Sequence, residues 1–326
     1  MKTSVPSQMK AAAIDRFGGP EVLGTKTVPV PQVGPGEVLI QVETAGIGQW
    51  DPAERAGEME GYKPGSKASF PYVLGTDGAG TVVALGEGVK NLKVGDKVYA
   101  FGFLNEKGGF YAEYTAVRAA DTAPVPKGLS AEQAGVLAAD GITALQGVED
   151  TLKVGQGTTL LVYGASGGVG HLAVQLAKRL GAKVLAVASG ADGVELMKKL
   201  GADKAVDGRS DDVAKAVRDF APDGLDAALV LAGGDKVNEL LKAVVKKGGH
   251  IAFPNGVEPA PKGPEGVKAT AYNGEANPKV LGRLNSLIES GPFHVEVSKV
   301  YRLDEVSRAH EAVGKHHLGK LALRIH

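Results

Sequence analysis

A glycine-rich segment, GASGGVG at residues 164–170, has residue types and spacing that indicate binding of a phosphate group. Glycine has no Cβ, so the backbone can approach a phosphate closely, and a helix that begins there offers amides and its positive dipole end. Gly167 and Gly170 match the second and third glycines of the pattern GxGxxG, whereas Ala165 stands at the first. We expect the whole segment to bind the pyrophosphate of a dinucleotide, through Gly164, Ala165, Ser166, Gly167, Gly168, Val169 and Gly170.

The segments around these glycines are those that such a site needs. Residues 158–163 are apolar and β-branched without alternation, as in a strand buried on both faces of a parallel sheet. Residues 169–180 place apolar side chains at the helical period, and residues 183–188 form a second apolar strand. This order favours a nicotinamide-cofactor oxidoreductase over an ordinary glycine-rich turn that binds nothing.

Composition and charge exclude several classes of protein. Lysine plus arginine and aspartate plus glutamate both number 37, so charge gives no reason to expect nucleic acid or an anionic membrane as partner. Residues 1–10 lack a signal-peptide core, and no stretch approaches the ~20 apolar residues of a membrane span. The chain has no cysteine, which excludes disulfides and thiolate metal sites. We expect a cytoplasmic enzyme.

The pattern of apolar, glycine and proline residues changes twice along the 326-residue sequence, which indicates two domains. Before about residue 126, short alternating runs such as residues 36–42 are broken by glycine and proline, as in a small β-rich domain. Beyond it, helices alternate with apolar strands, as in a doubly wound sheet, and the strands are predicted at residues 160–163, 184–188, 204–206, 227–231 and 250–253. We expect the final strand, residues 320–325, to rejoin the first domain.

Several segments in order resemble the medium-chain dehydrogenase/reductases, in their zinc-free branch of NADPH-dependent quinone oxidoreductases. They are residues 35–47, 70–82, 94–100, 108–114, 141–148, 164–170 and 319–325. The resemblance implies an α/β fold with a Rossmann doubly wound parallel sheet inserted in a chaperonin-10-like (GroES-like) β-rich domain. The expected ranges are 1–125 with 270–326 for the GroES-like substrate domain, and 126–269 for the NADP-binding domain.

The resemblance also bears on metal binding. Zinc-dependent members hold the metal with a cysteine and a histidine–glutamate pair, and these positions resemble Gly48 or Gln49 and Thr76 with Asp77. We therefore expect no zinc. Without a Lewis acid, alcohol oxidation is disfavoured, whereas reduction of a quinone or an activated alkene needs mainly a hydride donor. The adjacent residues His316 and His317 are expected to be surface or helix-end histidines.

The residue after the second strand indicates which cofactor is used. In NAD enzymes an acidic residue ~20 positions after the glycines binds the ribose 2′-hydroxyl, and here that place is taken by Ser189. Arg209 resembles a family position whose cation can reach a 2′-phosphate. The alternative is a solvated turn residue, because Asp211 and Asp212 follow it. We expect NADPH, with further contacts from the family-like positions Thr143, Phe253 and Asn255.

For the reacting end, a family segment that lines the quinone pocket resembles residues 48–57. Its asparagine and tyrosine appear here as Gly48 and Ala53, so substrate preference is expected to differ. Trp50 either stacks on a planar substrate or only packs, and Asp51 is either a proton donor or a structural cap. The candidate catalytic residues are Gln49, Trp50, Asp51 and Tyr111.

These observations predict an NADPH-dependent reductase that passes hydride to a quinone or an α,β-unsaturated carbonyl. Two alternatives stay open. One is an enoyl-thioester reductase, which needs a basic patch for a phosphopantetheine carrier, and the other is a non-catalytic NADPH-binding sensor or structural protein. We also expect a homodimer, because the apolar strand at residues 250–253 is expected to form a sheet edge that must be covered.

Overall fold

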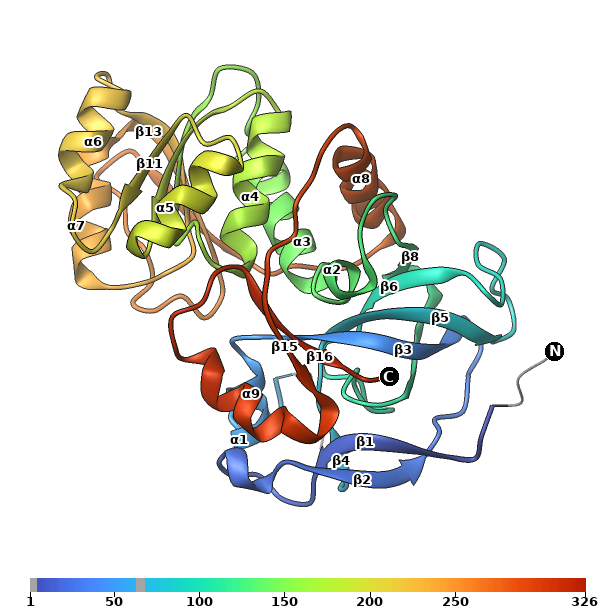
Figure 1. The fold of residues 1–326 in the computed structure, drawn as a ribbon. Helices are drawn as coiled ribbons and strands as arrows, with labels where there is room; N and C mark the ends of the chain where they lie inside the picture. Colours follow the sequence, from blue (N-terminus) through green and yellow to red (C-terminus); the bar gives the residue numbers. More distant parts are fainter. Residues whose placement is uncertain (1–4, 63–67) are drawn as a thin grey trace. The chain divides into compact units, whose positions relative to one another are not determined.

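The structure is a computed structural model that describes residues 5–62 and 68–326. Residues 1–4, part of the N-terminal stretch considered above, lie outside the described residues. By its packing the chain divides into two units, and the second is inserted in the sequence of the first (Figure 1). The first unit comprises Met1–Ala139, Ala276–Asn285 and Val297–His326, and the second comprises Asp140–Glu275 and Ser286–Glu296.

The boundaries of these two units differ from the domain boundaries expected from the sequence. The expected boundaries stay a prediction, because units defined by packing need not coincide with domains. The difference after residue 125 has a physical reason. Helix α2 (Ala131–Gly135) packs on strands β3 and β5 of the first unit, and its N-cap residue Ser130 forms a capping box with Gln133. The chain therefore completes the first unit before it enters the second.

The first unit is built on two β-sheets. A seven-stranded sheet has the order β15-β16-β3-β5-β6-β8, with β7 also paired to β3, and a three-stranded sheet has the order β2-β1-β4. Because β16 pairs antiparallel with β3, the end of the chain rejoins this unit, as predicted. The strands are β1 (Gln8–Ile14), β2 (Gly24–Pro29), β3 (Glu37–Ile47), β4 (Tyr72–Val73), β5 (Asp77–Leu85), β6 (Lys97–Phe101), β7 (Tyr114–Arg118), β8 (Thr122–Pro124), β15 (Val297–Arg302) and β16 (Lys320–Arg324).

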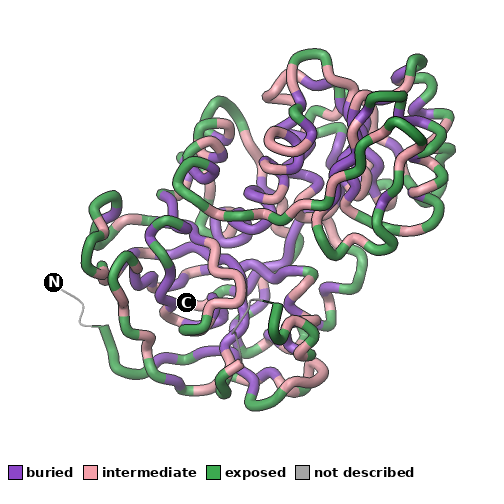
Figure 2. Tube along the Cα trace, turned by 180° about the vertical axis from the view of Figure 1, so that it is seen from behind, coloured by how far each residue is buried: buried purple, intermediate pink, exposed green. Residues whose placement is uncertain are grey.

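Alternating side chains of β3 enter the core of this unit. Val38, Ile40 and Val42 are fully buried there, and they pack in one cluster with apolar residues of β1, β5 and the last helix. Figure 2 shows buried stretches along the strands and exposed residues in the connections. Besides α2, the first unit contains α1 (Asp51–Ala56) and α9 (Val306–Val313), and α8 (Pro278–Glu289) begins in this unit and ends in the second.

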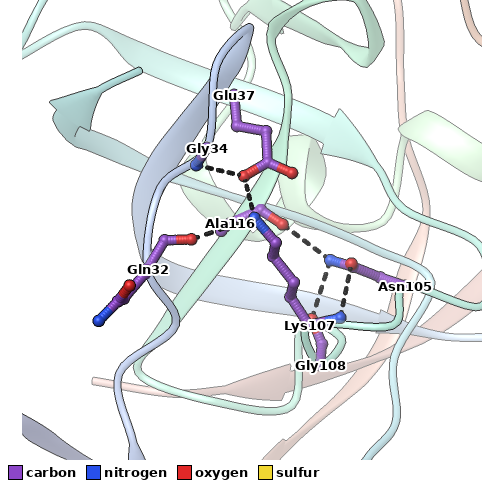
Figure 3. Close-up of polar contacts among 7 residues, drawn as sticks. All are labelled: Gln32, Gly34, Glu37, Asn105, Lys107, Gly108 and Ala116. Atoms are coloured by element: carbon purple, nitrogen blue, oxygen red, sulfur yellow. Dashed lines mark hydrogen bonds and ion pairs between the residues drawn. The ribbon is translucent and has the colours of Figure 1, made fainter. Parts of the chain in front are cut away.

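Polar contacts fix the loop that leads into β7 (Figure 3). The Asn105 side chain donates hydrogen bonds to the carbonyls of Gly108 and Ala116, both at 2.9 Å. The Lys107 ammonium pairs with Glu37 on β3. The loop is therefore tied to two neighbouring strands before the chain turns inward at Tyr111, which is fully buried.

The second unit contains the parallel sheet that the sequence predicts. Its strand order is β11-β10-β9-β12-β13-β14, and all five pairings are parallel. Leu161 of β9 packs in a cluster with α6 and α7, while its neighbours Leu160 and Val162 are equally buried on the opposite face. The strands are β9 (Thr159–Tyr163), β10 (Lys183–Ala188), β11 (Lys204–Asp207), β12 (Leu225–Val230), β13 (Val245–Pro254) and β14 (Lys268–Tyr272), and the helices are α3 (Ala138–Leu145), α4 (Gly168–Arg179), α5 (Gly190–Lys199), α6 (Val213–Phe220) and α7 (Asp235–Val244).

One expectation about this sheet is wrong. Residues 250–253 do not form an edge, because β13 lies between β12 and β14 and its residues from His250 to Pro254 pair with Lys268 to Tyr272. The edge strand on this side of the sheet is β14, which is short and largely exposed, and the other edge strand is β11. Among the described residues, the helices are all too short or too polar to cross a membrane.

Candidate active site

The glycine turn lies where β9 ends and α4 begins. Gly164 has a φ of +85°, a left-handed conformation that favours glycine, and its amide donates to the carbonyl of Val187 at 3.1 Å. Gly167 is the N-cap residue of α4, and the first turn of this helix carries no acidic residue of its own. The chain therefore places the N-terminus of a helix directly after a buried strand, as pyrophosphate binding requires.

Gly170 is required by close packing inside this turn. A Cβ at this position would stand 2.3 Å from the carbonyl oxygen of Gly164 and 2.6 Å from the Cα of Ala165. Both neighbours are backbone atoms, which cannot move without reshaping the turn. The third glycine of the pattern thus sets how closely helix α4 approaches the turn that follows β9.

The turns after β10 and β11 are joined by hydrogen bonds. Ser189, the N-cap residue of α5, donates its amide to the hydroxyl of Ser166 at 3.1 Å. Asp207, the last residue of β11, accepts the amides of Gly190 and Arg209, both at 3.0 Å. These amide hydrogen bonds, from Arg209 first and then Gly190, lower the pKa of Asp207. The carboxylate of Asp207 is therefore already hydrogen-bonded to the backbone of these two turns.

The two aspartates that follow Arg209 are also engaged. Asp211 accepts the amide of Asp207 at 2.8 Å, and Asp212 caps α6 by accepting the amide of Lys215 at 2.8 Å. Within the described part of the chain, the Arg209 guanidinium forms no ion pair, and the residue is exposed. The guanidinium is thus exposed at the surface of the turn, where its charge also helps to lower the pKa of Asp207.

Thr143 and the residues after β13 are brought together by Tyr272, the last residue of β14. The Tyr272 hydroxyl donates to the carbonyl of Thr143 at 3.0 Å, and its own carbonyl accepts the amide of Asn255 at 2.9 Å. Phe253 is buried at the end of β13. The cofactor candidates after the strands therefore lie at the carboxyl ends of the sheet, where α/β proteins bind their ligands.

In the first unit, Trp50 has a fixed position. Its indole N–H donates to the hydroxyl of Thr76 at 2.7 Å, and the Lys320 ammonium lies 5.1 Å from the centre of its ring. A Cβ on Gly48 would stand 2.4 Å from the indole, so the ring occupies the space beside that glycine. Gln49 between them is exposed, and its side-chain amide donates to the carbonyl of Val313 at 3.2 Å.

Asp51 and Tyr111 lie in the core of the first unit. Both are fully buried, the Tyr111 hydroxyl donates to the Asp51 carboxylate, and the same carboxylate accepts the amide of Gly48 at 2.8 Å. Burial, and then the charge of Glu54, raise the pKa of Asp51 to about 8. The carboxylate therefore holds the turn before α1.

A buried pair joins helix α1 to helix α9. The Arg55 guanidinium lies 3.0 Å from Nδ1 of His310, and it donates to the carbonyl of Gly18 at 3.0 Å. Burial, and then the neighbouring charge of Arg55, lower the pKa of His310 to about 3. The imidazole is therefore neutral at ordinary pH and accepts the hydrogen bond.

Two family descriptions match the chain. "Alcohol dehydrogenase GroES-like domain" matches residues 34–127, and "Zinc-binding dehydrogenase" matches residues 168–266. A 2-methylene-furan-3-one reductase from Solanum lycopersicum is 36% identical over 88% of this chain and 71% of its own length. The chain belongs to the medium-chain dehydrogenase/reductase superfamily, in its quinone oxidoreductase branch.

Two further proteins are similar. An NADPH-dependent alkenal/one oxidoreductase of Arabidopsis thaliana is 34% identical over 88% of this chain and 71% of its own length. The solved structure of a quinone oxidoreductase from Coxiella burnetii has a TM-score of 0.83 and 29% identity, with 98% of this chain and 100% of that chain covered. The Rossmann sheet inserted in a GroES-like β-rich domain is thus confirmed, and this family member is an oxidoreductase that uses a nicotinamide cofactor and a small-molecule substrate.

The residues at the family's zinc positions make other contacts here. Thr76 accepts the indole N–H of Trp50, and Asp77 accepts the amide of Ala139 at 3.0 Å. The Lys320 ammonium, buried like Asp77, lies 3.6 Å from the other oxygen of that carboxylate. No group of three or more histidine, cysteine or acidic side chains in the described residues is placed to hold a metal ion.

Several residues of the site were not predicted. Lys320 stands in a segment that carried the resemblance, but its sequence distance from Trp50 gave no sign of their contact. Tyr272 ends β14, and nothing in the nearby sequence indicates that its hydroxyl contacts Thr143. Asp140 is buried, and its carboxylate would stand 2.0 Å from a Cβ on Gly168, so it fills the space beside that glycine. Asp140 could not be predicted as part of the site, because its role depends on the contact of helix α3 with the glycine turn.

His316 and His317 follow α9 rather than end it. His316 is exposed, and the ring of His317 lies 2.8 Å from the carbonyl of Lys315. Both histidines were expected at the surface or at a helix end. They lie in the turn that follows the last helix.

Proposed function

We propose that this protein is an NADPH-dependent reductase that transfers hydride to a quinone or to the β-carbon of an α,β-unsaturated carbonyl, without zinc. The choice of NADPH rests on the arrangement of Ser189, Asp207 and Arg209 in the turns after β10 and β11. Two similar proteins, the 2-methylene-furan-3-one reductase and the NADPH-dependent alkenal/one oxidoreductase, are named for this class of acceptor.

The arrangement of these three residues favours a 2′-phosphate for electrostatic reasons. Ser189 stands where NAD enzymes have the acidic residue that binds the ribose 2′-hydroxyl. The nearby Asp207 accepts hydrogen bonds from two backbone amides. The acids after Arg209 accept backbone amides, and within the described residues neither forms an ion pair with this arginine. A guanidinium without an ion pair is a suitable partner for a phosphate dianion.

The remaining cofactor contacts follow the carboxyl ends of the strands. We propose that residues 164–170 bind the pyrophosphate, because Gly167 begins α4 and Gly170 leaves no room for a side chain. Thr143, Phe253 and Asn255 are proposed to face the nicotinamide end, since Tyr272 links Thr143 to the segment after β13. When bound, NADPH supplies the hydride.

For the acceptor, the four candidates divide into two pairs. Gln49 and Trp50 are partly or largely exposed, so we propose that they contact substrate. The Gln49 amide has a second N–H beside the one donated to Val313, and this N–H is proposed to stabilise negative charge on the carbonyl oxygen. Asp51 and Tyr111 are fully buried, and we propose that they position the turn at Gly48.

Two further expectations remain part of the proposal. A homodimer joined at exposed sheet edges is proposed to use β14 rather than residues 250–253, because β14 is the edge strand next to β13 and is largely exposed. The cytoplasmic location expected from the sequence is proposed unchanged.

The experiment is oxidation of NADPH, followed at 340 nm, with quinones, enones and enoyl thioesters as separate acceptors. Turnover with quinones or enones and little with thioesters supports the proposal. A clear preference for thioesters supports the enoyl-thioester alternative, and tight NADPH binding without turnover of any acceptor supports a sensor or structural protein.

A further inference from the structure

We infer that Trp50 determines acceptor specificity, because its fixed indole forms an apolar wall that favours acceptors with a planar conjugated ring over small acyclic ones. The inference rests on the proposed function, since it concerns the acceptor of the same reaction. The structure supports it through three contacts, each of which limits the movement of the ring.

The first contact holds the polar atom of the indole. Nε1 of Trp50 donates to Oγ1 of Thr76 at 2.7 Å, and Thr76 is only 2% exposed. Trp50 is also the N-cap residue of α1, so its backbone is fixed at the start of a helix. Because the indole N–H already has a partner, the ring can recognise an acceptor only through apolar contact.

The second contact is with Gly48. A Cβ on this residue would stand 2.4 Å from Cε2 of the indole, 2.6 Å from Cζ2 and 2.8 Å from Nε1. Since the nearest atom is at the fusion of the two rings, such a Cβ would stand on a face of the ring and not at its rim. Glycine at position 48 and tryptophan at position 50 are therefore a matched pair, and any side chain at position 48 displaces the indole.

The third contact is with Lys320. Its ammonium lies 5.1 Å from the centre of the Trp50 ring and 3.6 Å from Oδ1 of Asp77, and only 4% of the lysine is exposed. A buried ammonium is stabilised by an aromatic face and a carboxylate, so movement of the indole would remove part of its environment. Lys320 and Thr76 thus act as positioning residues for Trp50.

A half-buried indole held in this way has consequences for selectivity. Trp50 remains partly exposed, and a ligand that lies against the exposed part of the fixed ring gains contact area without ordering a mobile side chain. A bicyclic quinone covers much of such a surface, whereas a four-carbon enone covers little. The contact should lower KM for the ring acceptor more than it changes kcat.

The test compares kcat/KM for 1,4-naphthoquinone and but-3-en-2-one, with NADPH saturating, in wild type, Trp50→Ala, Gly48→Ala and the double variant. We expect Trp50→Ala to reduce the preference for the quinone about tenfold, mainly through KM. Gly48→Ala should reduce it as well, because the indole is displaced, and the double variant should match Trp50→Ala alone. An unchanged preference in Trp50→Ala, or additive effects in the double variant, would overturn the inference.

A second measurement does not depend on variants. Trp50 is the single tryptophan of the chain, so fluorescence excited at wavelengths that the eight tyrosines do not absorb reports on this ring alone. Quenching by 1,4-naphthoquinone should saturate near its KM, while free N-acetyltryptophanamide shows only linear quenching. Linear quenching of the protein would contradict contact with Trp50. Failure of the proposed function looks different, because wild type would then oxidise NADPH with neither acceptor.

Discussion

The hydroxyl of Tyr111 donates a hydrogen bond to the carboxylate of Asp51, and both side chains are fully buried. The same carboxylate accepts the amide of Gly48 at 2.8 Å. This arrangement connects the loop after β6 to the turn that carries Gln49 and Trp50. Asp51 therefore fixes the position of the turn at Gly48 rather than contacting substrate. Because its side chain is buried, its ionisation is coupled to the stability of the fold.

The first prediction concerns this coupling. Burial, and then Glu54, raise the pKa of Asp51 from 3.8 to about 8, so between these values the unfolded chain loses a proton that the folded chain keeps. The contribution of Asp51 to stability is complete below about pH 4 and is lost as pH rises toward 8. Asp51→Asn cannot ionise. Urea unfolding at pH 5, 6.5 and 8 should show the variant gaining on wild type by up to about 1.4 kcal/mol per pH unit.

Tyr111→Phe is the companion variant. The Tyr111 hydrogen bond lowers the pKa of Asp51, so its removal should extend the loss of stability to higher pH. A difference between Asp51→Asn and wild type that stays constant from pH 5 to 8 would show that the carboxyl group titrates normally.

The second prediction concerns the glycine turn. In Gly170→Ala the new Cβ would meet backbone atoms of Gly164 and Ala165, so helix α4 must move away from the turn. Since the pyrophosphate is common to both cofactors, affinity for NADPH and NADH should fall alike, by on the order of 100-fold. Isothermal titration measures both. Gly155→Ala is the control, because a Cβ there meets nothing within 4 Å; a loss of affinity for one cofactor alone would count against this reading.

Local sequence patterns predicted the parallel strands and the glycine turn because their periodicity and spacing are set by nearby residues. The edge of the sheet was predicted wrongly, since the order of parallel strands depends on crossovers that no local pattern records. Ile251 and Phe253 are apolar because they pack in one cluster with α6 and α7, while β14 pairs with the backbone of their strand.

The candidate site shows the same limit. Trp50, Thr76 and Lys320 meet although they are far apart in sequence, and their contacts depend on the pairing of β3 with both β5 and β16. The full burial of Asp51 could not be predicted either, because aspartate is rarely buried without partners and its partner Tyr111 lies 60 residues away.

The third prediction concerns metal. The chain has no cysteine, and Thr76 and Asp77 are engaged with Trp50, Ala139 and Lys320. The purified protein should therefore contain no stoichiometric zinc by elemental analysis, and chelators should leave its activity unchanged. One tightly bound equivalent of zinc would refute this prediction.

The fourth prediction concerns assembly. The carbonyl of Tyr272 faces β13, because it accepts the amide of Asn255, so alternation along β14 directs the backbone groups of Ala269 and Ala271 outward. Ala269→Pro removes one outward donor and should weaken a dimer joined through this edge. Light scattering at micromolar concentration should show a dimer for wild type and dissociation for the variant. A wild-type monomer would exclude this assembly.

A comparison of kcat/KM for NADPH and NADH with one quinone acceptor tests directly whether Arg209 binds the 2′-phosphate. A charge-assisted contact of Arg209 with the 2′-phosphate, worth ~1.5 to 3 kcal/mol, should favour NADPH by roughly ten- to a hundredfold. Arg209→Ala should lower the value for NADPH alone, Ser189→Asp should shift preference toward NADH, and the exposed Arg218→Ala should change neither. Equal values for the two cofactors in wild type, or no oxidation of either, would contradict the account.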